Sequence, residues 1–331
     1  NLIDEGNTIP FIARYRKEAH GSLDDQTLRG MAERLEYLRG LEKRREEVRG
    51  LIDAAGALTP EVAASLDAAS TLAELDDIYR PFRPKRRTRA SMAKEKGLEP
   101  LALLLLEQKP QVDPLAEAAA YIDAEKGVES AEDALAGARD IIAESVSDDP
   151  SLRKRLRVVA MAQSDLVSKA AKPDEDSVYA QYYDFRQPVR QAAGHRILAV
   201  DRGEREGFLK VSIELDRARA LSIVESVCVH GTSPSSQEVR TAAEDAYDRL
   251  IFPSLEREIR AVLTEKADED AIKVFRVNLR QLLMQPPVRG KVAIGLDPGY
   301  RTGCKVAVVD ATGRVLDTGV IYPTHSQTKK D

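Results

Sequence analysis

An aspartate that follows an apolar segment is the residue whose position most suggests chemistry. Asp297 stands in KVAIGLDPGYRTGCKVAVVD, which begins at Lys291, between an apolar strand pattern and a Pro-Gly turn. Metal-dependent phosphoryl transfer needs several carboxylates around two cations about 4 Å apart, because one aspartate can neither hold both ions nor offset their charge. Asp310 falls in a predicted hairpin turn and Asp317 in a third strand, at the end far from Asp297. We therefore expect Asp297 to be vestigial, with no catalytic residue and no metal site.

The densest basic run, RPFRPKRRTRASMAKEK, has the charge needed to contact nucleic-acid phosphates. From Arg83 to Lys96 it contains seven Lys or Arg and a single acid. Pro81 and Pro84 are expected to keep this segment out of a helix, so that its cations extend from a loop and can reach phosphates. The cations assigned to this site are Arg83, Lys85, Arg86, Arg87 and Arg89. A solvated loop, or arginines that pair with the acids of neighbouring helices, explains the run equally well.

A second basic segment lies near the start of the sequence. NTIPFIARYRKEAHGSLDD interleaves Arg14, Arg16 and Lys17 with Phe11 and Tyr15. Basic residues among aromatic ones can hold phosphates while the rings stack on bases. A structural role, in which the segment docks a helix end and its arginines bond to neighbouring acids, is the favoured alternative.

The other residues with chemical potential have no informative spacing. LRKRLR at 152–157 is predicted to be a solvated charge stripe on one face of a helix. The four histidines lie in separate segments without HxxxH or HExxH spacing, and the two cysteines, Cys228 and Cys304, form no CxxC pair. No GxSxG, Walker A or complete GxGxxG motif occurs. The turn after Asp297 is reminiscent of the first phosphate loop of actin-type ATPases, but no second loop accompanies it. We expect no cofactor.

Composition favours long helices with charged faces. The 331 residues are 32% charged and 5% aromatic and include no Trp, and the net charge is −5. A nucleic-acid site must therefore be a local patch. No apolar run approaches the roughly 20 residues of a membrane-spanning helix, so no membrane partner is expected. Two separated cysteines fit a reducing cytoplasm.

Helix signals dominate the first half of the chain. The longest amphipathic pattern begins at a capping signal, Ser22 followed by Asp25, and ends at Gly56. Shorter helices follow, and the last of them is expected from Pro150 to Lys169. The alternation in GFLKVSIEL then predicts one short strand near 208–215. A long helix precedes three strands at the C-terminal end.

Two segments predict domain boundaries. AAKPDEDS at 170–177 is polar and acidic, and the prolines of QPPVRG at 285–290 cannot continue a helix. We expect a helical region at 1–175, a central helical region at 176–286 and the start of a third domain at 287–331. The predicted fold class is mainly α: an elongated multi-helix assembly with a short strand near 208–215 and three strands at the C-terminal end.

Five segments together resemble the Tex family of bacterial transcription accessory proteins, in the expected order and over essentially the whole chain. They are EGNTIPFIARYRKEAHGSLDD, RPFRPKRRTRASMAKEKGLEPLA, GARDIIAE, YDRLIFPSLEREIR and FRVNLRQLLMQPPVRGKVAIGLDPGYRTGCKVAVVD.

The resemblance implies a modular architecture. It makes 1–175 an N-terminal Tex-type region with a helix-turn-helix-like element, and it makes 287–331 the start of a YqgF-type, RNase H-like α/β domain. In the family, helix-hairpin-helix elements and an OB-fold RNA-binding domain follow, so we expect this sequence to be part of a longer protein. The family's RNase H-like domain generally lacks a complete set of catalytic carboxylates, which implies a non-catalytic scaffold.

Two functions from different classes follow. The leading hypothesis is a nucleic-acid-binding transcription accessory factor that contacts RNA or DNA phosphates, independently of sequence, through the two basic segments. The alternative is a helical scaffold for proteins of the transcription machinery, such as RNA polymerase, with no direct nucleic-acid contact. Long amphipathic helices and the negative net charge support the alternative.

Overall fold

The computed structural model describes residues 2–286, 290–299 and 303–322. Most of these residues are helical, as the fold class predicted. The chain divides into two compact units, Asn1–Ala267 (unit 1) and Asp268–Asp331 (unit 2). In the described part of the chain, no helix combines the length and apolarity that crossing a membrane requires.

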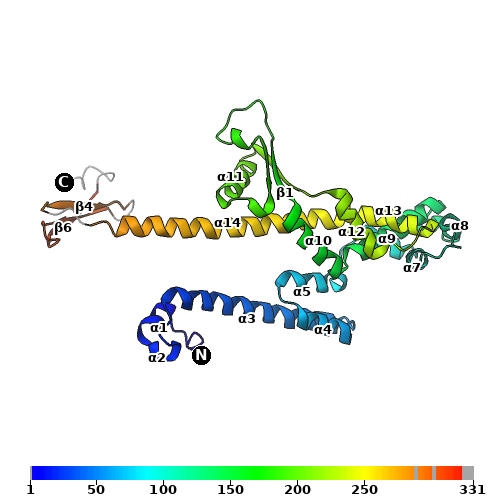
Figure 1. The fold of residues 1–331 in the computed structure, drawn as a ribbon, viewed down its shortest axis with the longest axis horizontal. Helices are drawn as coiled ribbons and strands as arrows, with labels where there is room; N and C mark the ends of the chain where they lie inside the picture. The colour runs from blue at the N-terminus through cyan, green and yellow to red at the C-terminus, as the bar shows by residue number, and fades with distance from the viewer. Residues whose placement is uncertain (1, 287–289, 300–302, 323–331) are drawn as a thin grey trace. The chain divides into compact units, whose positions relative to one another are not determined.

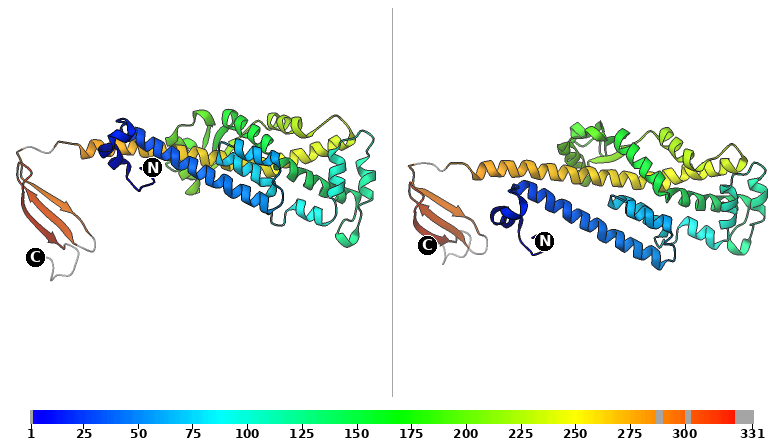
Figure 2. Two further views of the ribbon diagram at one scale, coloured as in Figure 1. Left: turned by 90° about the horizontal axis from the view of Figure 1, so that it is seen from below. Right: turned by 60° about the horizontal axis from the view of Figure 1, so that its bottom comes forward.

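The first helices of unit 1 form an arm built on one long helix. Their bounds are α1 (Ile9–Tyr15), α2 (Lys17–His20), α3 (Asp25–Ala54), α4 (Pro60–Ala68) and α5 (Leu72–Tyr79), followed by the 3-10 turn η1 (Arg80–Phe82). Figure 2 shows α4 and α5 beside α3 in two further views. Leu41, Val48 and Ile52 of α3 are buried in one cluster with Leu66 of α4 and Leu75 of α5.

The ends of α3 show how local signals define it. Gly56, just past the C-terminal end, has φ +68, the left-handed conformation that stops a helix. At the N-terminal end the predicted cap, Ser22, is wrong. Asp24 is the cap, because its carboxylate accepts a hydrogen bond from the Thr27 backbone N–H at 2.7 Å.

The remaining helices include a group that packs around α9. The bounds are α6 (Arg89–Glu95), α7 (Glu99–Leu106), α8 (Pro114–Ala119), η2 (Ala124–Lys126), α9 (Ala131–Ser147), α10 (Pro150–Gln163), α12 (Arg217–Cys228), α13 (Pro234–Asp245), the π-helical turn η5 (Ala246–Ile251) and α14 (Phe252–Leu283). Helices α6, α7, α8 and α13 all contact α9, whose Ala138, Ile142 and Ala143 are fully buried. Figure 1 shows α7, α8, α9 and α13 gathered at one end of this unit.

A small antiparallel sheet completes unit 1. Its strands are β1 (Asp165–Ala170), β2 (Asp184–Pro188) and β3 (Leu209–Glu214), in the order β2-β1-β3, accompanied by η3 (Ala180–Tyr182), η4 (Val189–Gln191) and α11 (Gly194–Arg205). The predicted strand near 208–215 is confirmed as β3.

The prediction of helix through Lys169 is wrong, because α10 ends at Gln163 and the next residues form β1. Strand β1 pairs with β2 and β3, so a boundary after residue 175 would separate it from both partners. This pairing argues against a domain boundary at that position.

Unit 2 contains the last part of α14 and a three-stranded antiparallel sheet. The strands are β4 (Ala293–Asp297), β5 (Cys304–Val309) and β6 (Val315–Ile321), in the order β4-β5-β6. The three predicted C-terminal strands are thus confirmed. Helix α14 ends at Leu283, before QPPVRG, part of which lies outside the described residues. The boundary at 286/287 therefore stays a prediction.

Candidate nucleic-acid interface

The basic loop, residues 83–88, is an irregular segment between two helical turns. Pro81 lies inside η1, and Thr88 caps α6 through a reciprocal capping box with Ser91. The Ser91 N–H donates to Thr88 Oγ1 at 3.0 Å, and the Thr88 N–H donates to Ser91 Oγ at 2.8 Å. Arg86 and Arg87 extend from the loop as predicted, but Arg89 is the first residue of α6. Its expected place in the loop is therefore corrected.

Two of the predicted phosphate-binding cations are engaged within the protein. The Lys85 ammonium contacts Glu144 at 3.1 Å and also pairs with Asp148, and the Lys85 side chain is only 26% exposed. The Arg83 guanidinium lies over the Tyr79 ring, 5.5 Å from its centroid, and 4.0 Å from an Asp76 carboxylate oxygen. Both residues contact neighbouring helices, which agrees with the alternative that the basic residues of this run pair with acids of those helices.

Arg86, Arg87 and Arg89 have a different environment. All three are exposed, and within the described residues no acid forms an ion pair with Arg86 or Arg87. Arg89 lies near Asp140. Burial raises the pKa of Asp140, and the positive charges of Arg249 and Arg89 partly offset that rise. Arg86 and Arg87 thus present two unpaired guanidinium groups. Arg89 lies beside them, and its charge interacts with the Asp140 carboxylate without forming an ion pair among the described residues.

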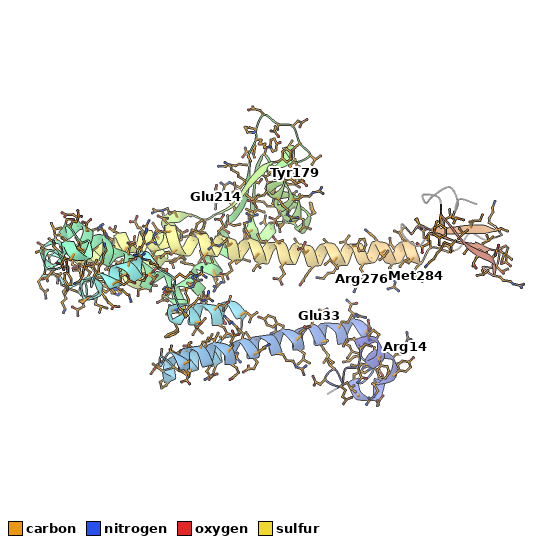
Figure 3. All side chains as sticks on the ribbon, turned by 180° about the vertical axis from the view of Figure 1, so that it is seen from behind. Arg14, Glu33, Tyr179, Glu214, Arg276 and Met284 are labelled. Carbon is orange, nitrogen blue, oxygen red and sulfur yellow. The ribbon has the colours of Figure 1, made fainter. Side chains whose placement is uncertain are left out.

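The N-terminal basic segment spans the end of α1 and the start of α2. Phe11 and Tyr15 are one turn apart on α1, with ring centroids separated by 5.2 Å, and the Tyr15 residue is 62% exposed. Arg16, between the helices, donates to Glu18 at 2.7 Å. Arg14 and Lys17 are exposed, and Figure 3 labels Arg14 at this end of the unit. An accessible ring therefore lies beside cations, the combination that single-stranded nucleic acid can use.

The structure does not join the two basic segments into one site. Among the residues it describes, no hydrogen bond, ion pair or ring contact links Arg14, Arg16 or Lys17 with the 83–89 segment. The 30-residue helix α3 lies between them in sequence. Each segment must therefore be judged by itself.

Asp297 is the last residue of β4 and lies opposite Lys305 of β5. Asp317 faces Val308, whose other neighbour is Ile294, so it lies toward the opposite end of the sheet. Asp310 occupies the hairpin turn, where its carboxylate accepts from the Thr312 and Arg314 backbone N–H groups at 2.8 and 3.0 Å. Hydrogen bonds from the Thr312 hydroxyl and backbone N–H lower the pKa of Asp310.

The carboxylates of Asp297, Asp310 and Asp317 therefore lie at separate positions in this sheet and its hairpin turn. Over residues 2–286, 290–299 and 303–322, no group of three or more His, Cys, Asp or Glu side chains is placed to hold a metal ion.

A buried ionic cluster is the feature that the sequence interpretation missed. Asp77 of α5 is 4% exposed and accepts from Arg153 Nε at 2.8 Å and from an Arg157 NH group at 2.6 Å. Arg157 also pairs with Glu258 of α14, and Arg153 donates to the Ser254 hydroxyl at 3.1 Å. The prediction that 152–157 is a solvated charge stripe is therefore wrong for Arg153, which is buried.

The buried ionic cluster holds the segment that precedes the basic loop in the chain. Arg80, three residues before Arg83, has its pKa lowered by burial and by the nearby charge of Arg153. Its Nε atom is buried and has no hydrogen-bond partner among the residues that the structure describes. Because α5, α10 and α14 meet at Asp77, the segment that leads into the basic loop starts from a fixed point.

Comparisons with known proteins give a consistent assignment. Three family models match: the Tex-like protein N-terminal domain at residues 1–53, the Tex central region-like model at residues 109–275 and the Tex protein YqgF-like domain at residues 291–331.

Individual relatives match along nearly the whole chain. Protein YdcI of Bacillus subtilis is 46% identical, covering 99% of this chain and 46% of that protein. Transcriptional accessory protein Tex of Neisseria gonorrhoeae is 41% identical, covering 97% and 43%. S1 RNA-binding domain-containing protein 1 of Pongo abelii is 31% identical, covering 97% and 34%. The chain thus spans less than half the length of these relatives, and by its N-terminal, central and YqgF-like matches it belongs to the Tex family.

Proposed function

We propose that this chain is the nucleic-acid-binding part of a transcription accessory factor, and that its basic loop contacts RNA or DNA phosphates without reading sequence. Support comes from the relatives' names, one a transcriptional accessory protein and another an S1 RNA-binding domain protein. Transcription in bacteria places such a factor in the cytoplasm, with RNA polymerase or its associated proteins as further partners. No cofactor is part of the proposal.

The observation that carries the proposal is the contrast among the loop cations. Lys85 is held by two acids and Arg83 by a ring and an acid, whereas Arg86 and Arg87 are exposed and no described acid pairs with them. Leaving two like charges adjacent and unpaired gives no stability to the fold. An external anion such as a phosphate would neutralise them and would release condensed counterions.

The test compares two triple variants with equal loss of charge. The first is Arg86→Ala with Arg87→Ala and Arg89→Ala. The control replaces three exposed arginines elsewhere in unit 1, Arg190, Arg205 and Arg219, by alanine. Fluorescence anisotropy with labelled single-stranded RNA and duplex DNA at about 50 mM salt should show binding by the parent chain and by the control. The loop variant should lose most of it, keeping only the weaker contribution of the N-terminal segment. An equal loss of binding in both variants would show that binding depends on net charge alone, and it would overturn the assignment of the basic loop as the binding site.

Lys85 and the N-terminal segment refine the assignment. Because Lys85 is engaged with Glu144 and Asp148, Lys85→Ala should weaken binding less than Arg86→Ala does. Arg14→Ala with Lys17→Ala should cause a smaller, additive loss, because this segment is proposed as a separate, weaker contact. Arg16 is expected to contribute least, because it is paired with Glu18.

We also propose that the RNase H-like part is non-catalytic. Among the described residues Asp297 belongs to no group of three or more metal-ligating side chains, and a two-metal mechanism needs several carboxylates. The chain should therefore release no nucleotides from labelled RNA or RNA–DNA hybrid in Mg²⁺ or Mn²⁺. Cleavage that disappears in Asp297→Asn would contradict this proposal without touching the binding assignment.

A further inference from the structure

The second half of α14 differs from the first half in both burial and charge. Up to Ala267, α14 buries Leu255, Ile259 and Leu263 against the core of unit 1. From Asp268 to Pro286 every residue is exposed. The sequence contains no acid between Asp270 and Asp297, although it contains five Lys or Arg there. The helix therefore continues into an acid-free, solvent-facing segment.

An apolar stripe runs along this exposed segment. Ile272, Phe275, Leu279 and Leu282 follow one another at intervals of three, four and three residues, which places them on one helix face. Their exposed fractions are 66%, 66%, 40% and 63%. Four neighbouring large apolar side chains at this exposure form the kind of contiguous patch that marks an interaction site.

Unpaired cations flank the stripe. Arg276 and Arg280 are one turn apart, and over the described residues no acid pairs with either of them. Figure 3 labels Arg276 and Met284 on this part of α14. Lys273 differs, because it is paired with Asp270 at 3.3 Å and Glu269 at 3.8 Å. The stripe thus has two positive charges free for an external partner.

We propose that residues 272–284 form a docking site for an acidic amphipathic helix of a partner protein. The apolar stripe would receive the partner's apolar residues, and Arg276 and Arg280 would pair with its flanking carboxylates. The stripe runs for about 15 Å along the helix at 1.5 Å per residue, enough for two to three turns of a partner. This site is independent of the basic loop and does not rest on the proposed nucleic-acid binding.

Charge and shape favour a protein helix over other anions. Nucleic-acid phosphates would satisfy the two arginines but would leave the apolar stripe in water. A membrane-surface helix usually carries many cations on its polar face, whereas the face opposite this stripe carries Val277, Gln281 and Met284 with Lys273 as its cation. A second copy of this segment would bring arginines against arginines. An acidic partner helix matches both features at once.

The test uses the full chain and two labelled synthetic helical peptides. Both peptides carry leucine at heptad positions a and d; one has glutamate at the flanking positions and the other has lysine. Fluorescence anisotropy at about 50 mM salt should show binding of the glutamate peptide and none of the lysine peptide. In Arg276→Glu with Arg280→Glu, the glutamate peptide should bind about tenfold more weakly and the lysine peptide should begin to bind. Unchanged preference in this variant would overturn the proposal.

Controls separate charge, apolar contact and alternative occupants. Lys210→Glu, at an exposed lysine on β3, should leave the preference unchanged, and Phe275→Ser should weaken binding of the glutamate peptide while circular dichroism stays helical. Loss of the glutamate peptide in Lys210→Glu would contradict the site. Three further outcomes would also overturn it: self-association that Phe275→Ser abolishes, tighter binding of anionic vesicles, or tighter binding of single-stranded RNA at this segment.

Discussion

Replacing Asp77 by alanine tests whether the buried ionic cluster holds the N-terminal arm on the rest of unit 1. Asp77 is the acceptor for both Arg153 and Arg157, and it is 4% exposed. After the substitution Arg157 keeps Glu258, but Arg153, whose side chain is 3% exposed, keeps only the Ser254 hydroxyl and the Ser147 carbonyl. Breaking a buried pair and leaving one charge uncompensated costs about 3 to 5 kcal/mol.

The adjacent residue supplies a matched control. Asp76 forms an ion pair with Arg44 at 2.7 Å, but its side chain is 50% exposed. Exposed pairs contribute about 0 to 1 kcal/mol, so Asp76→Ala should be nearly neutral although it removes the same group one position away. The chain contains no Trp, so urea unfolding is best followed by circular dichroism at the helix band.

We expect Asp77→Ala and Asp76→Ala to have clearly different midpoints of urea unfolding. At 1.4 kcal/mol per tenfold, the Asp77→Ala loss is about two to three and a half powers of ten in the unfolding equilibrium. A double replacement, Asp77→Leu with Arg153→Met, should recover much of that loss, because removing both charges leaves none buried and unpaired. Equal effects of Asp76→Ala and Asp77→Ala, or a loss below about 1 kcal/mol for Asp77→Ala, would refute this reasoning.

Two further predictions concern titrating groups. Hydrogen bonding to Lys154, followed by the Ser70 N–H, lowers the pKa of Glu74 from 4.5 to about 2, so its contribution to stability is present above pH 4.5 and is lost as the pH falls toward 2. Glu74→Gln should remove that part of the pH dependence of the urea midpoint, and an unchanged profile would contradict the assignment. Burial raises the pKa of the Cys228 thiol to about 11. At about pH 8 iodoacetamide should therefore modify Cys228 far more slowly in the folded chain than in urea, and equal rates would show that the site opens.

Local signals predicted the elements whose ends depend on neighbouring residues. Gly56 stops α3 through its own backbone conformation, and alternation within GFLKVSIEL is enough to indicate β3. The Asp310 turn likewise uses hydrogen bonds among residues 310–314, including those to Thr312 and Arg314. Asp24 replaced Ser22 as the α3 cap, because several residues before that helix are able to cap and only the backbone geometry selects one.

Contacts between distant residues left no comparable signal. Strand β1 has Leu166, Val167 and Ser168 buried in succession, so the period of two that identified β3 is missing from it. Asp77 and Arg153 are 76 residues apart, and neither residue's neighbours indicate the other. Arg153 lies beside Leu152 and Leu156 on the buried face of α10. An arginine at such a position indicates that a buried carboxylate must neutralise its charge.

The same limit applies to the basic loop. Its charge density was evident from the sequence, but its division into engaged and free cations was not. Lys85 finds Glu144 and Asp148 about 60 residues further along the chain, while Arg86 and Arg87 find no acid within the described part of the protein. Only the fold separates these cases, and that separation defines the proposed contacts.

The most direct test of the central claim is the salt dependence of nucleic-acid binding. Each phosphate contact contributes about 0.7 to 0.9 to the slope of log affinity against log salt, so three arginines should account for a slope of about 2 to 3. Measured by anisotropy between about 50 and 200 mM salt, that slope should be present in the parent chain and in the Arg190, Arg205 and Arg219 control. It should fall by about 2 to 3 after Arg86, Arg87 and Arg89 become alanine. An unchanged slope in the loop variant would contradict the account.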